Sequence, residues 1–161
     1  MAKRGKTFIA PASMTRRILA FIIDLIIINL IIALPFRKIF RKLIPTGMSY
    51  SAAKIYFQQN PQLLTGLSTI FFIIGILVVL YFTYLEYKLQ QTPGKMLLNL
   101  YIVPQGKISF WNYLLSNITF IPSFPFTLLW IIDPIYMFRS PKNQRFMEKI
   151  SRILVVQKYK Y

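Results

Sequence analysis

The chain has 161 residues, which fits a single domain, and its 55% hydrophobic content exceeds the roughly 45–50% of soluble proteins. Its 20 Lys and Arg against four Asp and Glu give a net charge of +16. Most basic residues cluster outside the apolar runs with few interleaved aromatics, which indicates membrane-helix flanks and no nucleic-acid binding. The chain has neither Cys nor His, so disulfides, thiolate and imidazole metal sites and His general bases are excluded; we expect no enzyme activity, metal or cofactor.

The first predicted element is a membrane-spanning helix over about residues 17–35. Residues 1–15 are polar and basic and are interpreted as a short cytoplasmic tail that turns into this helix. Asp24 lies near the middle of the apolar stretch. A carboxylate at the centre of a membrane helix costs about 3 kcal/mol on insertion scales, so it is normally kept only with a partner or a function.

The partner of Asp24 is not fixed by its own helix. Arg17 lies on the same helix face, but two turns or roughly 10 Å away, which is too far for a direct pair. An ionised Asp24 therefore needs a basic group from elsewhere, Lys95 or Arg145, with Asn29 as a hydrogen-bond donor on an adjoining helix face. The alternative is a protonated Asp24 that only holds the helix bundle together by hydrogen bonding.

Residues 36–66 connect the first helix to the second. Residues 36–44 alternate basic and apolar side chains, which is typical of a helix in the membrane interface or, equally well, of a solvated connector. A looser polar piece follows. The second membrane helix is predicted over about residues 66–86, an apolar run with tyrosines at its exit: Tyr81, Tyr84 and Tyr87.

A turn at Pro93-Gly94 and a small sheet are predicted next. Residues 98–103 alternate like a strand, and the Pro-Gln-Gly stretch after them favours a short β-hairpin with residues 108–110. The β-branched run 152–156 is expected to pair with 98–103 at the cytoplasmic surface. The segment Thr92-Pro-Gly-Lys95 lacks the spaced glycines of a phosphate loop, so nucleotide binding is excluded.

The third hydrophobic segment covers residues 111–138 and is broken at 122–125 by two prolines. A single kinked crossing is one interpretation, and a hairpin of two short helices that returns to its starting side is the other. The hairpin places most basic residues on the cytoplasmic side, whereas a single crossing places most of them outside. The positive-inside rule therefore favours the hairpin, with both termini cytoplasmic.

Two further acidic positions are candidates. Asp133 precedes Pro134 and is expected to cap the helix that begins there. If it instead faces Asp24, the two would form a pair with coupled titration, which is typical of proton-linked cation exchange. Arg145 and Glu148 are three residues apart, which predicts a surface pair within one helix worth only tenths of a kcal/mol, on the order of other exposed pairs.

Taken in this order, these motifs resemble the RDD family of small integral membrane proteins, from about residue 12 to residue 156. The matching features are Arg17 with Asp24, the run from Gln91 to Val103 that contains Thr92-Pro-Gly-Lys95, then Gly106, and the closing run from Gln144 to Val156. The chain departs from the family pattern in having Glu148 at the acidic place, Ser151-Arg152 for a Gly-Thr, and Ser116-Asn117 for an Arg-Asn. Cation/proton antiport has been suggested for some members, so the resemblance implies transport.

We therefore expect an all-α membrane protein of one domain over residues 1–161: two full transmembrane helices plus a proline-broken hairpin, with a small β-hairpin at the cytoplasmic surface. One functional hypothesis is transport of cations, protons or another small ligand. The alternative is a non-transporting scaffold or accessory subunit that binds anionic lipid or a membrane partner. The expected partners are a bilayer with anionic lipids and a second copy or another membrane protein, in the cell membrane. The candidate ligand-binding residues are Asp24, Asp133 and Asn29, and the charge partners are Arg17, Lys95, Arg145 and Glu148.

Overall fold

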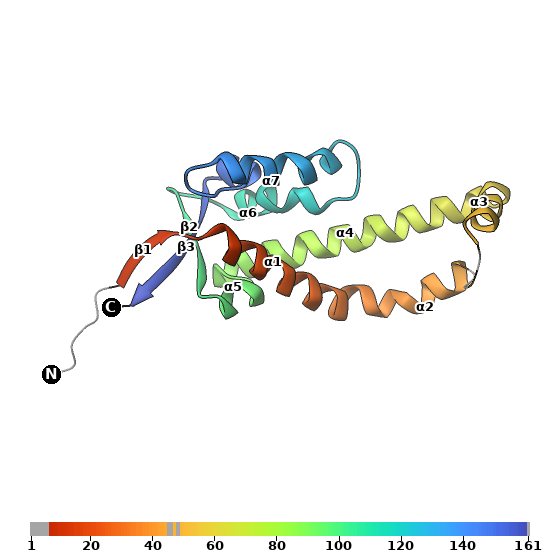
Figure 1. Ribbon diagram of the computed structural model, residues 1–161, viewed down its shortest axis with the longest axis horizontal. Coiled ribbons are helices and arrows are strands. Elements are labelled where there is room, and N and C mark those ends of the chain that lie inside the picture. Colours follow the sequence, from red (N-terminus) through yellow and green to blue (C-terminus); the bar gives the residue numbers. More distant parts are fainter. Residues whose placement is uncertain (1–6, 45–46, 48, 161) are drawn as a thin grey trace.

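The computed structural model describes residues 7–44, 47 and 49–160. It is mostly helical: two long helices run side by side, a small sheet lies at one end of them, and a helical hairpin packs along one flank (Figure 1). The predicted class is confirmed in its main features: the structure is mostly helical, with two helices long and apolar enough to cross a membrane and a small sheet. The first six residues of the predicted N-terminal tail lie outside the described part of the chain.

The first long helix runs without interruption from Met14 to Leu43. It comprises α1 (Met14–Ile28), a π-helical turn (Asn29–Ala33) and α2 (Leu34–Leu43). Its 30 residues give a length of about 45 Å at 1.5 Å per residue, which exceeds the hydrocarbon thickness of about 30 Å. The basic segment after the predicted span is therefore a continuation of the same helix, and its charges lie beyond the apolar part.

The second long helix, α4, extends from Pro61 to Leu89 and contains the predicted span 66–86. Proline at its first position has no N–H to leave unpaired there, and Gln90 ends it in the left-handed region with φ of 54°. The prediction of a loose polar connector before α4 is wrong for one segment. Residues Tyr50–Gln59 form a helix, α3, whose first turn is capped by Ser49 accepting from the Ala52 N–H at 3.3 Å.

The third hydrophobic segment folds as two pieces. Helix α6 (Phe110–Asn117) leads into a 3-10 turn (Ile118–Phe120), and after the prolines a second 3-10 turn (Phe126–Leu128) leads into α7 (Leu129–Arg139). The break at 122–125 is where the sequence predicts it. Figure 1 shows α7 running back beside α6 toward the end that carries the sheet.

The break at residues 122–125 packs against the second long helix, α4. A Cβ atom added at Gly75 of α4 would lie 2.2 Å from Cδ of Pro122, so only glycine permits this close approach. Phe82 of α4 also stacks on Phe120, with ring centroids 4.8 Å apart. These contacts fix the hairpin against α4.

The sheet has three strands in the order β1-β3-β2: β1 (Thr7–Pro11), β2 (Leu100–Pro104) and β3 (Ile153–Lys160). Both neighbouring pairs are antiparallel, with Ile9 opposite Lys158 and Ile102 opposite Val155. The predicted pairing of 98–103 with 152–156 is confirmed. Strand β1 falls in the segment predicted as a tail, and so was not predicted.

The predicted β-hairpin with residues 108–110 is wrong. Strand β2 pairs with β3, and the Gln105 N–H also donates to the Arg152 carbonyl at 2.8 Å. Ser109 instead precedes α6, where its backbone N–H donates to the Asn112 side chain at 2.9 Å. The capping chemistry of Ser109 and Asn112 therefore starts a helix at the position predicted as the second strand of the hairpin.

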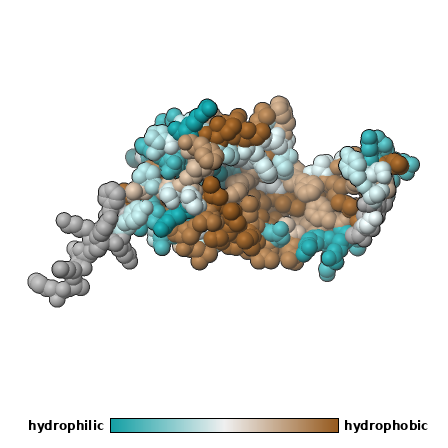
Figure 2. Space-filling model, in the orientation of Figure 1, coloured by the Kyte–Doolittle hydropathy of each residue, from teal (hydrophilic) through white to brown (hydrophobic). Residues whose placement is uncertain are grey.

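Apolar side chains are buried at the sheet but exposed on the long helices. A compact apolar cluster lies at the sheet, formed by Ala12, Ala20, Leu100, Ile102, Tyr113, Ile153 and Val155. The long helices instead expose large apolar side chains over most of their surface, and only 17% of the most apolar stretch of each helix is buried. Figure 2 shows this apolar surface across the middle of the molecule, with hydrophilic side chains at both ends. This distribution is typical of helices in contact with lipid.

Candidate functional site

All the negative side chains of the molecule are buried. The chain has four carboxylates, and their exposed fractions are 1% for Asp24 and 2% for Glu86, Asp133 and Glu148. They line a single cavity of about 400 Å³, together with three basic side chains: Arg17, Lys95 and Arg145. A chain with a net charge of +16 thus collects every acidic side chain around one cavity, which is partly open because lining side chains such as Trp130 and Phe138 are exposed.

Asp24 is held by the short segment that follows α4. The Thr92 hydroxyl donates to one carboxylate oxygen at 2.5 Å, and the Gly94 N–H donates to the other at 2.8 Å. Thr92 also precedes the short helix α5 (Pro93–Leu97) and accepts from the Lys95 N–H at 3.4 Å. A Cβ at Gly94 would lie 2.1 Å from the Ala20 carbonyl oxygen, so glycine is required for this segment to reach the first helix.

The expectation that Asp24 has a partner is confirmed, but the partners proposed from the sequence are wrong. Neither Lys95 nor Arg145 makes an ion pair with it among the described residues. Asn29 is exposed on the outer face of the π-helical turn and does not line the cavity. Asn29 lies five residues after Asp24, and at about 100° per residue this turns it about 140° around the helix, away from the side on which Asp24 lies.

Lys95 is paired with a carboxylate that the sequence did not single out. Its Nζ lies 2.5 Å from Oε1 of Glu86, near the end of α4. The other oxygen of Glu86 accepts from the Asn117 side-chain N–H at 2.8 Å, and the same amide nitrogen also donates to the Tyr113 carbonyl at 3.0 Å. Glu86 thereby connects α4 to α5 and α6.

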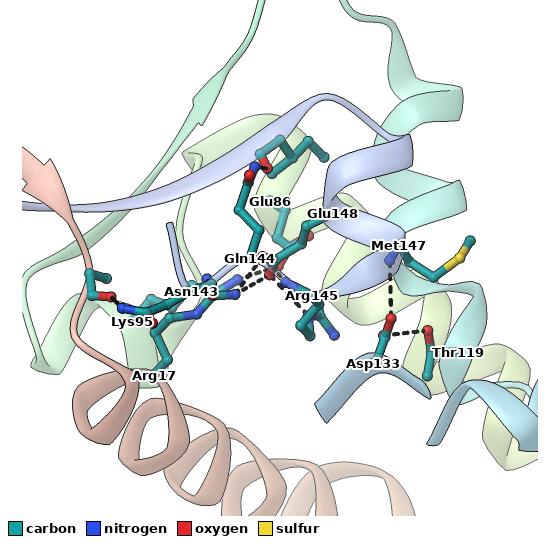
Figure 3. A network of polar contacts seen from close by, with 12 residues as sticks. Arg17, Glu86, Lys95, Thr119, Asp133, Asn143, Gln144, Arg145, Met147 and Glu148 are labelled. Carbon is teal, nitrogen blue, oxygen red and sulfur yellow. Dashed lines mark hydrogen bonds and ion pairs between the residues drawn. The ribbon is translucent and has the colours of Figure 1, made fainter. Parts of the chain in front are cut away.

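Glu148 is the most strongly paired acid. Arg17 Nη2 lies 2.5 Å from both of its oxygens, and Arg145 Nε lies 2.9 Å from one of them (Figure 3). Arg17 also donates to the Asn143 carbonyl. The predicted ion pair between Arg145 and Glu148 does form. It is not at the surface as predicted, because the first helix and its Arg17 cover it.

This pairing controls the titration of Glu148. Burial alone raises the pKa of a carboxyl group, but the charges of Arg17 and Arg145 and the hydrogen bonds from Arg17 outweigh it and lower the pKa of Glu148 to about 2. For the same reason, the carboxylates around Arg145, Glu148 first among them, raise its pKa although burial acts to lower it. Both shifts favour the charged forms of Glu148 and Arg145 at neutral pH.

Asp133 has a different role from the predicted one. Helix α7 begins at Leu129, so Asp133 already lies inside it and does not cap a helix that starts at Pro134. Its carboxylate accepts from the Thr119 hydroxyl and from the Met147 N–H, both at 3.0 Å (Figure 3). Met147 is in the first turn of α8 (Phe146–Ile150), so Asp133 satisfies a free N–H of another helix.

The four carboxylates fall into two classes. Glu86 and Glu148 have basic counter-ions, whereas Asp24 and Asp133 accept hydrogen bonds only from hydroxyl and backbone N–H groups. Asp24 and Asp133 line the same cavity, but no hydrogen bond joins them within the described part of the chain. With all seven ionisable groups charged, the lining carries four negative and three positive charges.

Aromatic side chains form much of the rest of the wall. Phe21 of α1 stacks on Phe120 with ring centroids 5.9 Å apart, and Phe120 stacks in turn on Phe82. The Trp130 indole N–H donates to the Thr119 carbonyl at 2.6 Å, which places the ring beside the residue that holds Asp133. The cavity is therefore apolar over most of its wall, with charged groups gathered on part of it.

The structure brings together six of the seven candidate residues. It also shows several functional residues that were not predicted from the sequence. Arg17, Asp24, Lys95, Asp133, Arg145 and Glu148 all line the cavity. The missed residues are Glu86, Thr92, Gly94, Asn117 and Thr119. Glu86 carried a usable signal, since it ends an apolar run in a chain with only four acids. In the ranges 7–44, 47 and 49–160, no group of three or more acidic, His or Cys side chains is suited to hold a metal ion.

Comparison with known proteins gives one result. The model of the RDD family matches residues 11–152, which is most of the chain. No curated protein matches, and no solved structure does.

Proposed function

The chain belongs to the RDD family of membrane proteins, and from that premise we propose that it binds a monovalent cation, the proton included, in the cavity lined by the four carboxylates and exchanges it across the membrane. One observation carries the proposal. Asp24 and Asp133, the two carboxylates without a basic counter-ion in the part of the chain that the structure describes, line the same cavity.

The energetics of burial support a positively charged ligand at this place. A buried carboxylate without a counter-ion is costly, because hydrogen bonds from neutral donors replace only part of the lost hydration. Around the cavity four acids face three bases, so one positive charge balances the lining. A bound cation or proton provides that charge, and its release restores the imbalance.

The shape of the fold supports a defined orientation. Strands β1 and β3 pair with each other, so both ends of the described chain lie on the same side of the molecule. We place this end on the cytoplasmic side of the cell membrane, because most basic residues outside the long helices are near it. Two long helices and a hairpin enclose little space by themselves, so the proposal includes a second copy or a partner membrane protein to complete a pathway.

A second function, a scaffold that binds anionic lipid, is favoured by a separate observation. Because all four acids are buried, the outer surface carries basic side chains without any acidic ones. Such a surface is attracted to anionic headgroups by about 1 kcal/mol per basic residue near the membrane. This attraction is compatible with transport, but it requires no cavity.

The test is cation flux in reconstituted vesicles. We expect an imposed pH gradient to drive monovalent cation movement, with at least a tenfold loss of rate in Asp24→Asn and Asp133→Asn. Lys142→Gln, which changes an exposed basic residue, is the matched control and keeps the rate. Thermal unfolding in detergent shows whether each variant is folded. Equal flux in folded wild type and both Asn variants contradicts the proposal, and absence of flux combined with binding to phosphatidylglycerol vesicles supports the scaffold instead.

A further inference from the structure

We propose that the cation taken up by the cavity is an organic primary ammonium ion with an aromatic or aliphatic body. The inference rests on the cation-binding function proposed above and narrows its ligand. It follows from the size of the cavity, its aromatic wall, the acids and bases that line it, and one acceptor without a donor.

The size of the cavity excludes a close fit around a bare metal ion. Its volume of about 400 Å³ falls in the range of roughly 300–1,000 Å³ that small-molecule sites occupy. A hard metal cation needs about six oxygen ligands at short distances. Most of the side chains that line the cavity are apolar, so it offers too few oxygens for such a shell.

The wall is suited to a ligand with an apolar body. Phe21, Phe120 and Phe82 form a stacked series, and Trp130 lies on the side of Asp133. A cation over an aromatic face gains about 0.5–2 kcal/mol, and an apolar ligand body gains further from leaving water. An ammonium group with a ring or alkyl chain uses both kinds of wall, whereas a hydrated inorganic ion uses neither.

An unpaired acceptor indicates that the ligand carries N–H groups. Asn117 lines the cavity, is 1% exposed, and its Oδ1 has no hydrogen-bond donor among the described residues. Its orientation is fixed, because the amide nitrogen donates to both Glu86 and the Tyr113 carbonyl. A buried acceptor without a donor is destabilising, and an ammonium N–H satisfies it.

The charge of the lining sets the charge of the ligand. The excess of one acid over the bases matches a monovalent cation and does not match an anion or a divalent ion. Together, a volume of small-molecule size, aromatic walls, an acceptor without a donor and one acid in excess of the bases describe a site for a hydrophobic amine in its protonated form.

The experiment is calorimetric titration of the full chain in phosphatidylcholine nanodiscs. The probe is 2-phenylethylammonium. Three comparators each lack one feature: methylammonium has no ring, 2-phenylethanol has no charge, and the N-trimethylated probe has no N–H. We expect the probe to bind at least tenfold more tightly than each comparator. Methylammonium or the alcohol binding as tightly as the probe overturns the organic-ammonium assignment, and equal binding of the trimethylated compound overturns the role of Asn117.

Variants link the binding to the cavity. Phe21→Leu, at one end of the stacked series, keeps an apolar side chain but removes a π face of the wall, and we expect about fivefold weaker binding. Phe124→Leu is its matched control, because Phe124 is 78% exposed and does not line the cavity; it leaves binding unchanged. Asp133→Asn is expected to weaken binding tenfold. Equal affinity in all three folded variants overturns the assignment of the ligand to this cavity.

The outcome separates this inference from the proposed function. If no ammonium compound binds but Asp24-dependent monovalent cation or proton flux is measured in vesicles, the organic ligand is wrong and the cation function stands. If neither binding nor Asp24-dependent flux is found, both are wrong. Binding of the probe together with Asp24-dependent flux of the probe itself supports both.

Discussion

Gly94 donates its backbone N–H to the carboxylate of Asp24 over 2.8 Å, although 70 residues separate the two in the chain. The Thr92 hydroxyl completes this contact on the other oxygen. The Thr-Pro-Gly-Lys segment therefore resembles a phosphate loop only in composition, since the anion it receives is a side chain of its own protein. It fastens the loop after α4 to the middle of the first helix.

The first prediction concerns this fastening. Gly94→Ala should destabilise the protein by about 2–4 kcal/mol, in the range of other changes that overpack a buried contact. The reason is that the added Cβ would lie 2.1 Å from the Ala20 carbonyl oxygen and 2.9 Å from Cγ of Asp24. Chemical unfolding in mild detergent measures the effect. Gly66→Ala is the control, because its Cβ meets nothing within 4 Å and alanine favours the helix by about 1 kcal/mol. Equal stability of the two variants would contradict the prediction.

The second prediction concerns the buried ion cluster. Glu148→Gln leaves Arg17 and Arg145 charged and buried without their acid, and we expect a loss of about 3–5 kcal/mol of unfolding free energy. Lys142→Gln, at an exposed position, should change stability by less than about 0.5 kcal/mol. A loss below 1 kcal/mol in Glu148→Gln would show that the cluster is open to water, on the order of surface pairs.

The third prediction is the pH dependence that the same residue produces. The pKa of Glu148 is lowered from its ordinary value of 4.5 to about 2 in the folded protein. A lowered folded-state pKa gives stability that is present above pH 4.5 and is lost as the pH falls toward 2. The contribution is about 3 kcal/mol, at about 1.4 kcal/mol for each pH unit between the two values. The unfolding free energies of wild type and Glu148→Gln should therefore converge between pH 4.5 and 2. A difference that stays constant over this interval is the contrary result.

The fourth prediction concerns orientation in the membrane. The chain has no cysteine, so single cysteines report the side on which each segment lies. Lys158→Cys in β3 should react with a membrane-impermeant maleimide only after the cells are permeabilised. Ala52→Cys in α3, at the far end of the long helices, should react in intact cells (Figure 1). The reverse pattern would invert the proposed orientation, and labelling of both in intact cells would contradict two complete crossings.

The parts of the fold that follow from local pattern were predictable. The two membrane helices follow from their long uncharged runs, and the break at Pro122 and Pro125 follows from the missing N–H groups. The pairing of β2 with β3 follows from two short β-branched runs. Strand β1 was not predictable in this way, because Thr7–Pro11 is short and lies in a basic segment, and it becomes a strand only through the edge that β3 offers.

The sequence predicts that Asp24 needs a partner inside the protein, but it does not predict which groups supply it. The cost of burying a carboxylate implies that Asp24 has company, and it does. Which groups supply that company depends on where a loop 70 residues away is placed, and no local spacing encodes this. The same limit explains Glu148: its spacing from Arg145 describes a local pair, whereas its burial depends on Arg17 from the other end of the chain.

The central position of β3 has a consequence for how the protein is made. Strands β1 and β2 both hydrogen-bond to β3 and not to each other, yet β3 is synthesised after them. While the ribosome is still translating the hairpin, β1 and β2 have no edge to pair with, and Arg17 has not yet met Glu148. Closure of the sheet thus waits for β3, which is synthesised after the residues of both long helices, so that one strand completes both pairings at once.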